Sequence, residues 1–110
     1  MHPSALPSVR PGSTGDDLLL DVREQHEWDE VRAPGAVHVP LHELPSRLDE
    51  VRAQVGEGRV SVICHLGGRS AQATAFLLAQ GVQARNVDGG MDAWQAAGLP
   101  VETGAAPPTA

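Results

Sequence analysis

The stretch that decides the fold is Val60-Ser61-Val62-Ile63-Cys64-His65-Leu66-Gly67-Gly68-Arg69-Ser70. A largely apolar run at 60–63 leads into the only cysteine of the chain, and an alanine-rich segment with helical spacing follows at 69–80. A short apolar run that ends in a turn is typical of a strand buried on both faces. A strand that delivers a thiol into a glycine turn before a helix indicates a place where a thiolate can be formed and used.

Segments of the same two kinds alternate on both sides of this stretch. The expected strands are residues 18–22, 37–39, 60–63 and 85–87, and the expected helices are residues 24–31, 45–55, 69–80 and 91–97. The clearest helix has one apolar stripe, formed by Leu41, Leu44, Leu48, Val51 and Val55. Strands that alternate with helices predict a compact α/β layer fold with a mainly parallel sheet.

The bulk composition limits both the architecture and the partners. A chain of 110 residues with 41% hydrophobic residues predicts one domain with one core. We expect that domain at 16–101, after a flexible or loosely docked arm at 1–15 and before a flexible tail at 102–110, because prolines, glycines and small residues crowd both ends. A net charge of −6 without a basic cluster argues against nucleic acid and anionic membranes as partners.

The single cysteine also bears on the cellular setting. It excludes an internal disulfide and an internal resolving thiol, which suits a reducing compartment. No apolar run approaches the roughly 20 residues that a membrane span needs, and the first residues lack the features of a signal peptide. We therefore expect a soluble, cytoplasmic protein.

The surroundings of Cys64 favour its ionised form. A cysteine thiol in water has a pKa of about 8.5, and the thiolate is the nucleophile. A helix that begins just after the cysteine offers unpaired N–H groups and the positive end of its dipole. Gly67 and Gly68 allow successive N–H groups to point inward, Arg69 adds a permanent positive charge, and His65 adds a titratable one. An inert buried cysteine, the usual kind, would not require Gly-Gly-Arg-Ser at this spacing.

Five segments in order carry a family resemblance. They are Asp21-Val22-Arg23-Glu24, Glu27-Trp28, the turn and strand at 34–40, the cysteine stretch at 62–70, and Gly-Gly-Met-Asp-Ala-Trp at 89–94. Together they resemble a rhodanese-like sulfurtransferase domain over about residues 18–101. The resemblance implies a rhodanese-like fold, with a five-stranded, mostly parallel sheet flanked by helices on both faces. It also implies that the cysteine loop is the active site.

The resemblance assigns roles to the residues of that loop. Cys64 would attack a sulfane-sulfur donor, such as thiosulfate or a small persulfide, and its persulfide would pass the outer sulfur to cyanide, a thiol or a protein acceptor. Arg69 would close the loop and add positive charge. Asp21 and Arg23 would support the loop, as a structural ion pair rather than as catalytic groups. The residues expected to cradle the outer sulfur are His65, Leu66, Gly67, Gly68, Arg69 and Ser70. No cofactor is implied.

Two departures from the family pattern modify this expectation. The family often has arginine or lysine directly after the cysteine, whereas this chain has His65 followed by the apolar Leu66. A less cationic mouth predicts weak use of the thiosulfate dianion, which improves as His65 is protonated. The usual Gly-His before the Pro-Gly turn is replaced by Val31-Arg32, and the role of Arg32 stays open.

Three alternatives remain. A cysteine phosphatase of this fold needs one more residue between cysteine and arginine than the four present here. A non-catalytic rhodanese-like binding module is the second alternative, which the retained Cys64 argues against. A metal site is disfavoured, because Pro40 separates His38 from His42 and solvent-facing histidines are the better interpretation. The expected core anchors are Trp28 and Trp94, and the acidic pair Asp16-Asp17 is expected on the solvated surface.

Overall fold

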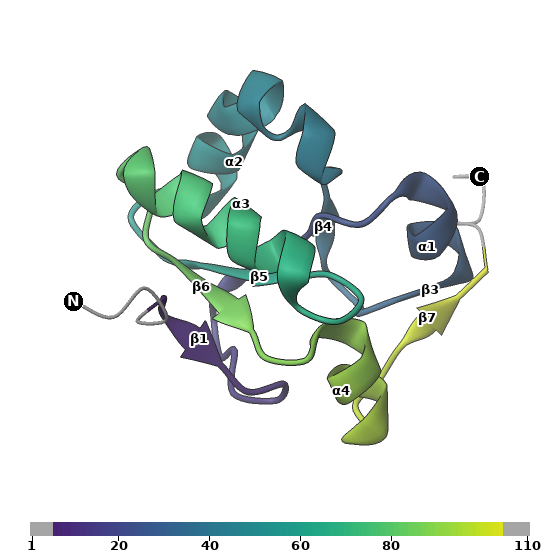
Figure 1. The fold of residues 1–110 in the computed structure, drawn as a ribbon. Helices are drawn as coiled ribbons and strands as arrows, with labels where there is room; N and C mark the ends of the chain where they lie inside the picture. The colour runs from purple at the N-terminus through teal and green to yellow at the C-terminus, as the bar shows by residue number, and fades with distance from the viewer. Residues whose placement is uncertain (1–5, 105–110) are drawn as a thin grey trace.

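The computed structural model describes residues 6–104, which form a parallel five-stranded sheet with the strand order β1-β6-β5-β2-β4 (Figure 1). Its strands are β1 (Ser8–Val9), β2 (Leu18–Asp21), β4 (Val37–His38), β5 (Val60–Ile63) and β6 (Ala84–Val87). The helices are α1 (Gln25–Glu30), α2 (Leu48–Val55), α3 (Gly68–Ala79) and α4 (Gly90–Ala96), and two 3-10 turns, η1 (Leu41–Glu43) and η2 (Pro45–Arg47), precede α2. A second sheet pairs β3 (Val31–Arg32) with β7 (Glu102–Thr103). The predicted fold class is therefore confirmed.

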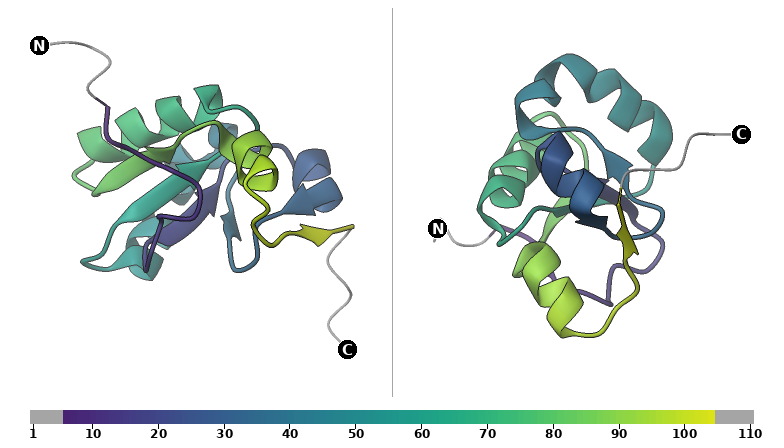
Figure 2. Two further views of the ribbon diagram at one scale, coloured as in Figure 1. Left: turned by 90° about the horizontal axis from the view of Figure 1, so that it is seen from below. Right: turned by 90° about the vertical axis from the view of Figure 1, so that its right-hand side faces the viewer.

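Helices cover both faces of the sheet, with α2 and α3 on one face and α4 on the other (Figures 1 and 2). Side chains alternate along β5 as its pleat requires: Val60 and Val62 pack with Leu77 of α3, whereas Ile63 packs with Met91 and other residues of α4. The central strands are buried on both sides, which explains why β5 is apolar at three of its four positions. Within residues 6–104, no helix combines the length and the apolar character that crossing a bilayer requires.

The parallel register brings the carboxyl ends of three strands to one edge of the sheet. Asp21, the last residue of β2, lies beside Ile63, the last residue of β5. Asn86 of β6 lies beside Val62 on the other side of β5. Cys64 follows β5 directly and therefore emerges between the ends of these two neighbours, at the edge where open parallel sheets bind ligands.

Both ends of the described chain contain strands that the composition does not predict. Ser8–Val9 pairs with β6, and Val9 is buried, so this part of the arm, which was expected to be flexible or loosely docked, forms an edge strand. Glu102–Thr103 pairs antiparallel with β3, so the expected tail begins with a strand. Both strands are only two residues long and are held by contacts with distant parts of the chain, which local composition does not report. The expected flexibility of residues 1–5 and 105–110 lies outside the described residues.

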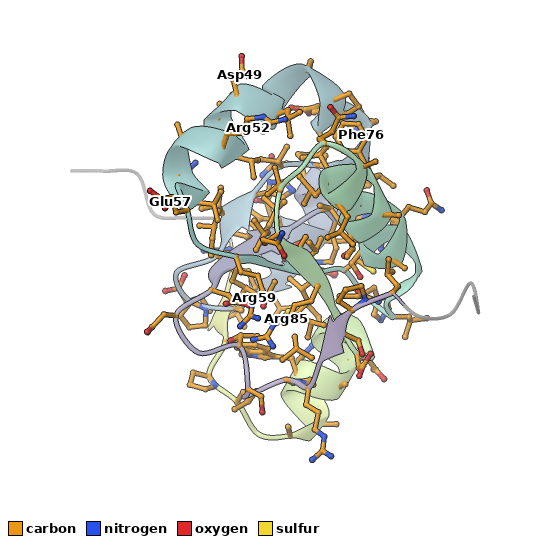
Figure 3. The ribbon with its side chains drawn as sticks, turned by 90° about the vertical axis from the view of Figure 1, so that its left-hand side faces the viewer. Asp49, Arg52, Glu57, Arg59, Phe76 and Arg85 are labelled. Carbon is orange, nitrogen blue, oxygen red and sulfur yellow. The ribbon has the colours of Figure 1, made fainter. Side chains whose placement is uncertain are left out.

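A polar cluster closes the opposite, amino-terminal end of the sheet. Figure 3 shows Arg59 and Arg85 side by side, and the Nε atoms of both donate to Asp17. Ser61 donates its hydroxyl to the same carboxylate at 2.6 Å. Burial alone would raise the pKa of Asp17, but the hydrogen bonds from Ser61, Arg85 and Arg59 outweigh it and lower that pKa. The expectation of a solvated Asp17 is wrong, because its carboxylate is bonded to three side chains and is 8% exposed. These donors come from β5, β6 and the residue before β5, which the local sequence around Asp17 does not show.

Candidate active site

The sulfur of Cys64 lies at the centre of the loop between β5 and α3. Its side chain is buried, with 1% of the residue exposed. The backbone N–H groups of Gly67 and Ser70 donate to Sγ, at 3.1 and 3.3 Å. Gly67 has φ = 115° and is the N-cap of α3, a conformation that residues with a side chain rarely adopt. The predicted nest of inward N–H groups therefore has two donors on the sulfur itself.

Two carbonyl groups of the same loop, those of Cys64 and His65, point the other way, toward α4. The N–H of Met91 donates to the carbonyl of Cys64 at 2.7 Å, and the N–H of Asp92 donates to the carbonyl of His65 at 3.1 Å. Gly90 makes this approach possible, because a Cβ at that position would lie 2.3 Å from the Cys64 carbonyl oxygen. The start of α4, which lies next to the loop between β5 and α3 in Figure 1, thus satisfies these two carbonyls. The N–H groups of Gly67 and Ser70 stay directed at the sulfur.

Arg69 forms an ion pair with Glu27 of α1. Its Nη1 and Nη2 atoms donate to the two carboxylate oxygens at 2.6 and 2.8 Å. The hydrogen bonds from Arg69 lower the pKa of Glu27 to about 2, helped by the backbone N–H of Glu24 and opposed by burial. The carboxylate is therefore charged at neutral pH and compensates the positive charge that the sequence places beside Cys64. The ion pair also joins the loop to α1.

Asp21 and Arg23 form the ion pair that the sequence predicts, and both are buried. The guanidinium contacts both carboxylate oxygens, and it also donates to the backbone carbonyls of Glu27 and Val31, at 3.2 and 2.6 Å. The pair therefore fixes α1 and the residue after it. Its connection with the cysteine loop runs through Glu27, whose side chain holds Arg69.

Asn86 of β6 contacts the loop from the side opposite β2. Its amide Nδ2 donates to the carbonyl of Gly67 at 3.2 Å, and its Oδ1 accepts from the hydroxyl of Ser70. Ser70 is fully buried, and its Oγ lies 3.2 Å from the sulfur of Cys64. Sequence reasoning missed Asn86, Glu27 and Gly90 as supports of the loop. The available signal for Asn86 was a polar residue in a short strand whose end meets that of β5.

The mouth of the site is an open cavity of about 380 Å³ lined by Cys64, His65, Leu66, Gly68, Arg69 and Gln72. His65 is exposed, and Leu66 is 67% exposed, the more exposed of the two large hydrophobic residues at the described surface. A hollow of about 420 Å³ lies elsewhere, beside Asp17 and Arg59, and has no cysteine in its lining. The smaller cavity is the one that holds the thiol, and Arg69, already paired with Glu27, is the only Arg or Lys among the described residues that line it.

The two tryptophans have different environments. Trp94 is buried in the α4 core, as the sequence predicts. Trp28 is half-buried and stacks on His38, with ring centroids 4.8 Å apart, while the guanidinium carbon of Arg32 lies 5.3 Å from the Trp28 ring centre. Trp28 is thus not a core anchor. His38 is half-buried rather than solvent-facing, since Nε2 contacts the carbonyl of Arg23 at 2.7 Å.

Arg32 has a definite structural role in this arrangement. Its Nη1 donates to the carbonyls of Trp28 and Gly104, at 3.0 and 2.7 Å. Its Nε lies 3.5 Å from the carboxylate of Glu102. Arg32 therefore holds β7 against the segment that follows α1.

Comparisons with known proteins agree with this geometry. A family model described as "Rhodanese-like domain" matches residues 10–97. A sulfurtransferase of Allochromatium vinosum is 37% identical over 86% of this chain and 86% of its own length. The chloroplastic thiosulfate sulfurtransferase 16 of Arabidopsis thaliana is 33% identical over 90% of this chain and 96% of its own length.

The solved structures give the same result. A rhodanese-related protein of Thermoplasma volcanium superposes with a TM-score of 0.80 at 28% identity, over 87% of this chain and 97% of that one. The chain spans only part of some longer relatives, for example 40% of a putative sulfur carrier protein of Bacillus subtilis. The similarity therefore covers nearly all of the described residues and includes the whole cysteine loop.

Proposed function

The chain belongs to the rhodanese-like domain family, and on that premise we propose that it is a sulfurtransferase that works through a persulfide on Cys64. The observation that carries the proposal is the pair of N–H donors on a buried sulfur, from Gly67 and Ser70. A thiolate or a persulfide anion needs such donors once it leaves water. The retained nucleophile and its complete cradle favour this activity over a binding module without catalysis.

The proposed reaction has two steps that balance in atoms and charge. The Cys64 thiolate attacks the outer sulfur of thiosulfate, the S–S bond of the donor breaks, and sulfite leaves with the bonding electron pair. The product is a Cys64 persulfide anion. An acceptor nucleophile, such as cyanide or a thiolate, then attacks the outer sulfur, and the electron pair of the S–S bond returns to Cys64 as a thiolate. A small persulfide serves as donor in the same way, with a thiolate as the leaving group.

The other loop residues act through this sulfur. We propose that the backbone from His65 to Ser70 binds the outer sulfur, whereas Arg69 closes the loop by its ion pair with Glu27. Asp21 and Arg23 act as positioning residues, because their contacts end on the segment that presents Glu27. A free thiol that must stay reduced suits a reducing, cytoplasmic setting, with small molecules or a protein as sulfur donors and acceptors.

Mass spectrometry of the intact protein tests the proposal. After incubation with thiosulfate or a small persulfide, the mass should increase by one sulfur atom, and cyanide should remove that atom as thiocyanate. Cys64→Ser should show neither change. If no sulfane donor adds sulfur to the folded protein, the enzymatic proposal is wrong and a binding module is the better interpretation. Release of phosphate from an aryl phosphate would instead support a phosphatase, which the short loop argues against.

A further inference from the structure

The hydroxyl group of Ser70 has more neighbours than its single proton can serve. Its Oγ lies 3.2 Å from the sulfur of Cys64 and 3.2 Å from the carbonyl oxygen of Gly67, and it lies still closer to Oδ1 of Asn86. A hydroxyl donates one hydrogen bond and accepts up to two. The direction of this one proton therefore decides whether the sulfur of Cys64 faces an O–H donor or an oxygen lone pair.

Asn86 determines that direction. Its Nδ2 lies 3.2 Å from the Gly67 carbonyl oxygen, which can only accept, so the amide must turn its NH2 group toward Gly67. Oδ1 then faces Ser70 and also can only accept. Ser70 must therefore donate to Asn86, and the lone pairs of its oxygen are left to face Cys64.

This orientation suits a protonated sulfur and opposes an ionised one. The thiol of Cys64 can donate its proton to Ser70 Oγ, at the observed 3.2 Å. After that proton has passed to water, the negative sulfur would face an oxygen lone pair, unless the hydroxyl leaves Asn86 and donates to the sulfur. We infer that Asn86 is a positioning residue that holds the Ser70 hydroxyl away from Cys64, so that the thiolate must compete with Asn86 for this one proton.

In the sulfur-transfer cycle, this competition affects the thiolate and the persulfide differently. This step of the inference rests on the proposed function. In the persulfide, the negative charge is on the outer sulfur, and Sγ needs no donor from Ser70. The hydroxyl then stays on Asn86. When the acceptor removes the outer sulfur, Sγ receives the electron pair and becomes a thiolate that attracts the hydroxyl. Asn86 thus favours charge on the outer sulfur, which binds the loop N–H groups, over charge on Sγ.

Other charges around the sulfur are unchanged by a substitution at Asn86. These charged groups belong to the loop and the start of α3, to α1, to the end of β2, to the residue after β6 and to the first turn of α4. They are His65, Arg69, Glu27, Asp21, Arg23, Asp88 and Asp92. Asn86→Ala and Ser70→Ala both leave this set intact. A difference between these variants in the pH at which the thiolate forms is therefore caused by the Ser70 hydroxyl and not by a change in the surrounding charges.

The test uses alkylation, because the chain has one cysteine and the reaction reports Cys64 alone. The rate with iodoacetamide is measured against pH for the parent, Asn86→Ala, Ser70→Ala and the double variant. Asn86→Ala releases the hydroxyl to the thiolate, so the midpoint of the rate profile should fall by about one pH unit, the effect of one hydrogen bond to a charged group. In the Ser70→Ala background the same substitution should have no effect.

Two results would overturn the inference. A midpoint that stays in place or rises in Asn86→Ala means that Asn86 supports the thiolate through the loop backbone. A fall that persists without the Ser70 hydroxyl means that the effect does not pass through Ser70. Neither result depends on a sulfur donor, so failure here differs from failure to form a persulfide.

Infrared spectroscopy gives a second measurement, which needs only Ser70→Ala and serves if Asn86→Ala does not fold. The single S–H stretching band should lie at the frequency of a hydrogen-bonded thiol in the parent at low pH. Loss of the acceptor in Ser70→Ala should move the band to the frequency of a free thiol. A band that is the same in both proteins would show that Ser70 does not accept from Cys64, and the inference would be wrong.

Discussion

The guanidinium of Arg69 and the carboxylate of Glu27 form a two-bond ion pair between the cysteine loop and α1, with N–O distances of 2.6 and 2.8 Å. The carboxylate is 18% exposed and also accepts from the backbone N–H of Glu24, so one side chain both caps α1 and holds the loop. The loop is thus anchored by α1 through Arg69, by α4 through the backbone and by β6 through Asn86.

This ion pair should make stability depend on pH in the acid range. The pKa of Glu27 is lowered from 4.5 to about 2, so its contribution is fully present above about pH 4.5 and is lost as the pH falls through about 2. Urea unfolding should show Glu27→Gln less stable than the parent at neutral pH, with the difference shrinking in that window. Glu30→Gln, at an exposed position of the same helix, is the matched control. A difference that is constant from neutral to acid pH would contradict the ion-pair assignment.

The rim at His65 should control the use of thiosulfate. A permanent positive charge at this exposed position should attract the dianion more strongly than histidine does. His65→Arg should therefore raise kcat/KM roughly fivefold near pH 8, the equivalent of about 1 kcal/mol for one exposed charge. His65→Gln, which carries no charge, is the matched control and should not raise kcat/KM. Equal values of kcat/KM for His65→Arg and His65→Gln would show that charge at this position does not control the use of thiosulfate.

Gly90 should tolerate no side chain. A Cβ there would lie 2.3 Å from the carbonyl oxygen of Cys64, and the residue has φ = +57°. Gly98 has φ = +74° with nothing within 4 Å, so Gly98→Ala isolates the backbone cost, about 1–2 kcal/mol. Gly90→Ala should cost about 3 kcal/mol or more in urea unfolding, and its folded fraction should form persulfide poorly. Equal costs for both variants would show that the contact with Cys64 is not tight.

Arg32 should stabilise β7. Its side chain is buried and donates to the carbonyls of Trp28 and Gly104, so Arg32→Gln should cost about 2 kcal/mol of unfolding free energy. Amide exchange should accelerate at residues 102–103 more than in the central strands. Arg47→Gln removes a surface arginine paired with Glu43 and should change stability by no more than about 0.5 kcal/mol. If amide exchange at β7 stays slow in Arg32→Gln, contacts other than those of Arg32 hold that strand in place.

The centre of the fold is predictable because its signals are local. The apolar run before Cys64 and the glycines after it specify β5, the loop and the start of α3 within a residue or two. The edge strands β1 and β7 are not predictable in this way. Each has two residues, and each exists only because its backbone pairs with a strand far away in the chain.

The site shows the same division. Cys64 and the loop that follows it are recognisable from residue type and spacing, whereas the groups that orient them lie on other elements. Asn86 faces Ser70 only because β6 lies beside β5, and Gly90 lies against Cys64 only because the start of α4 packs on the loop. The compensation of Arg69 by Glu27 also depends on the placement of α1. These contacts depend on how the helices and strands pack against one another, and that packing cannot be read from a single sequence.

The bonds from Met91 and Asp92 to the cysteine loop have a consequence for how the protein is made. A ribosome delivers Cys64 before it has synthesised the residues that turn the loop carbonyls outward. During that interval the two backbone hydrogen bonds from α4 to the loop carbonyls cannot form. The loop seen in the structure is therefore completed only after Met91 and Asp92 have left the exit tunnel. The sulfur chemistry proposed for Cys64 would begin only after that point in synthesis.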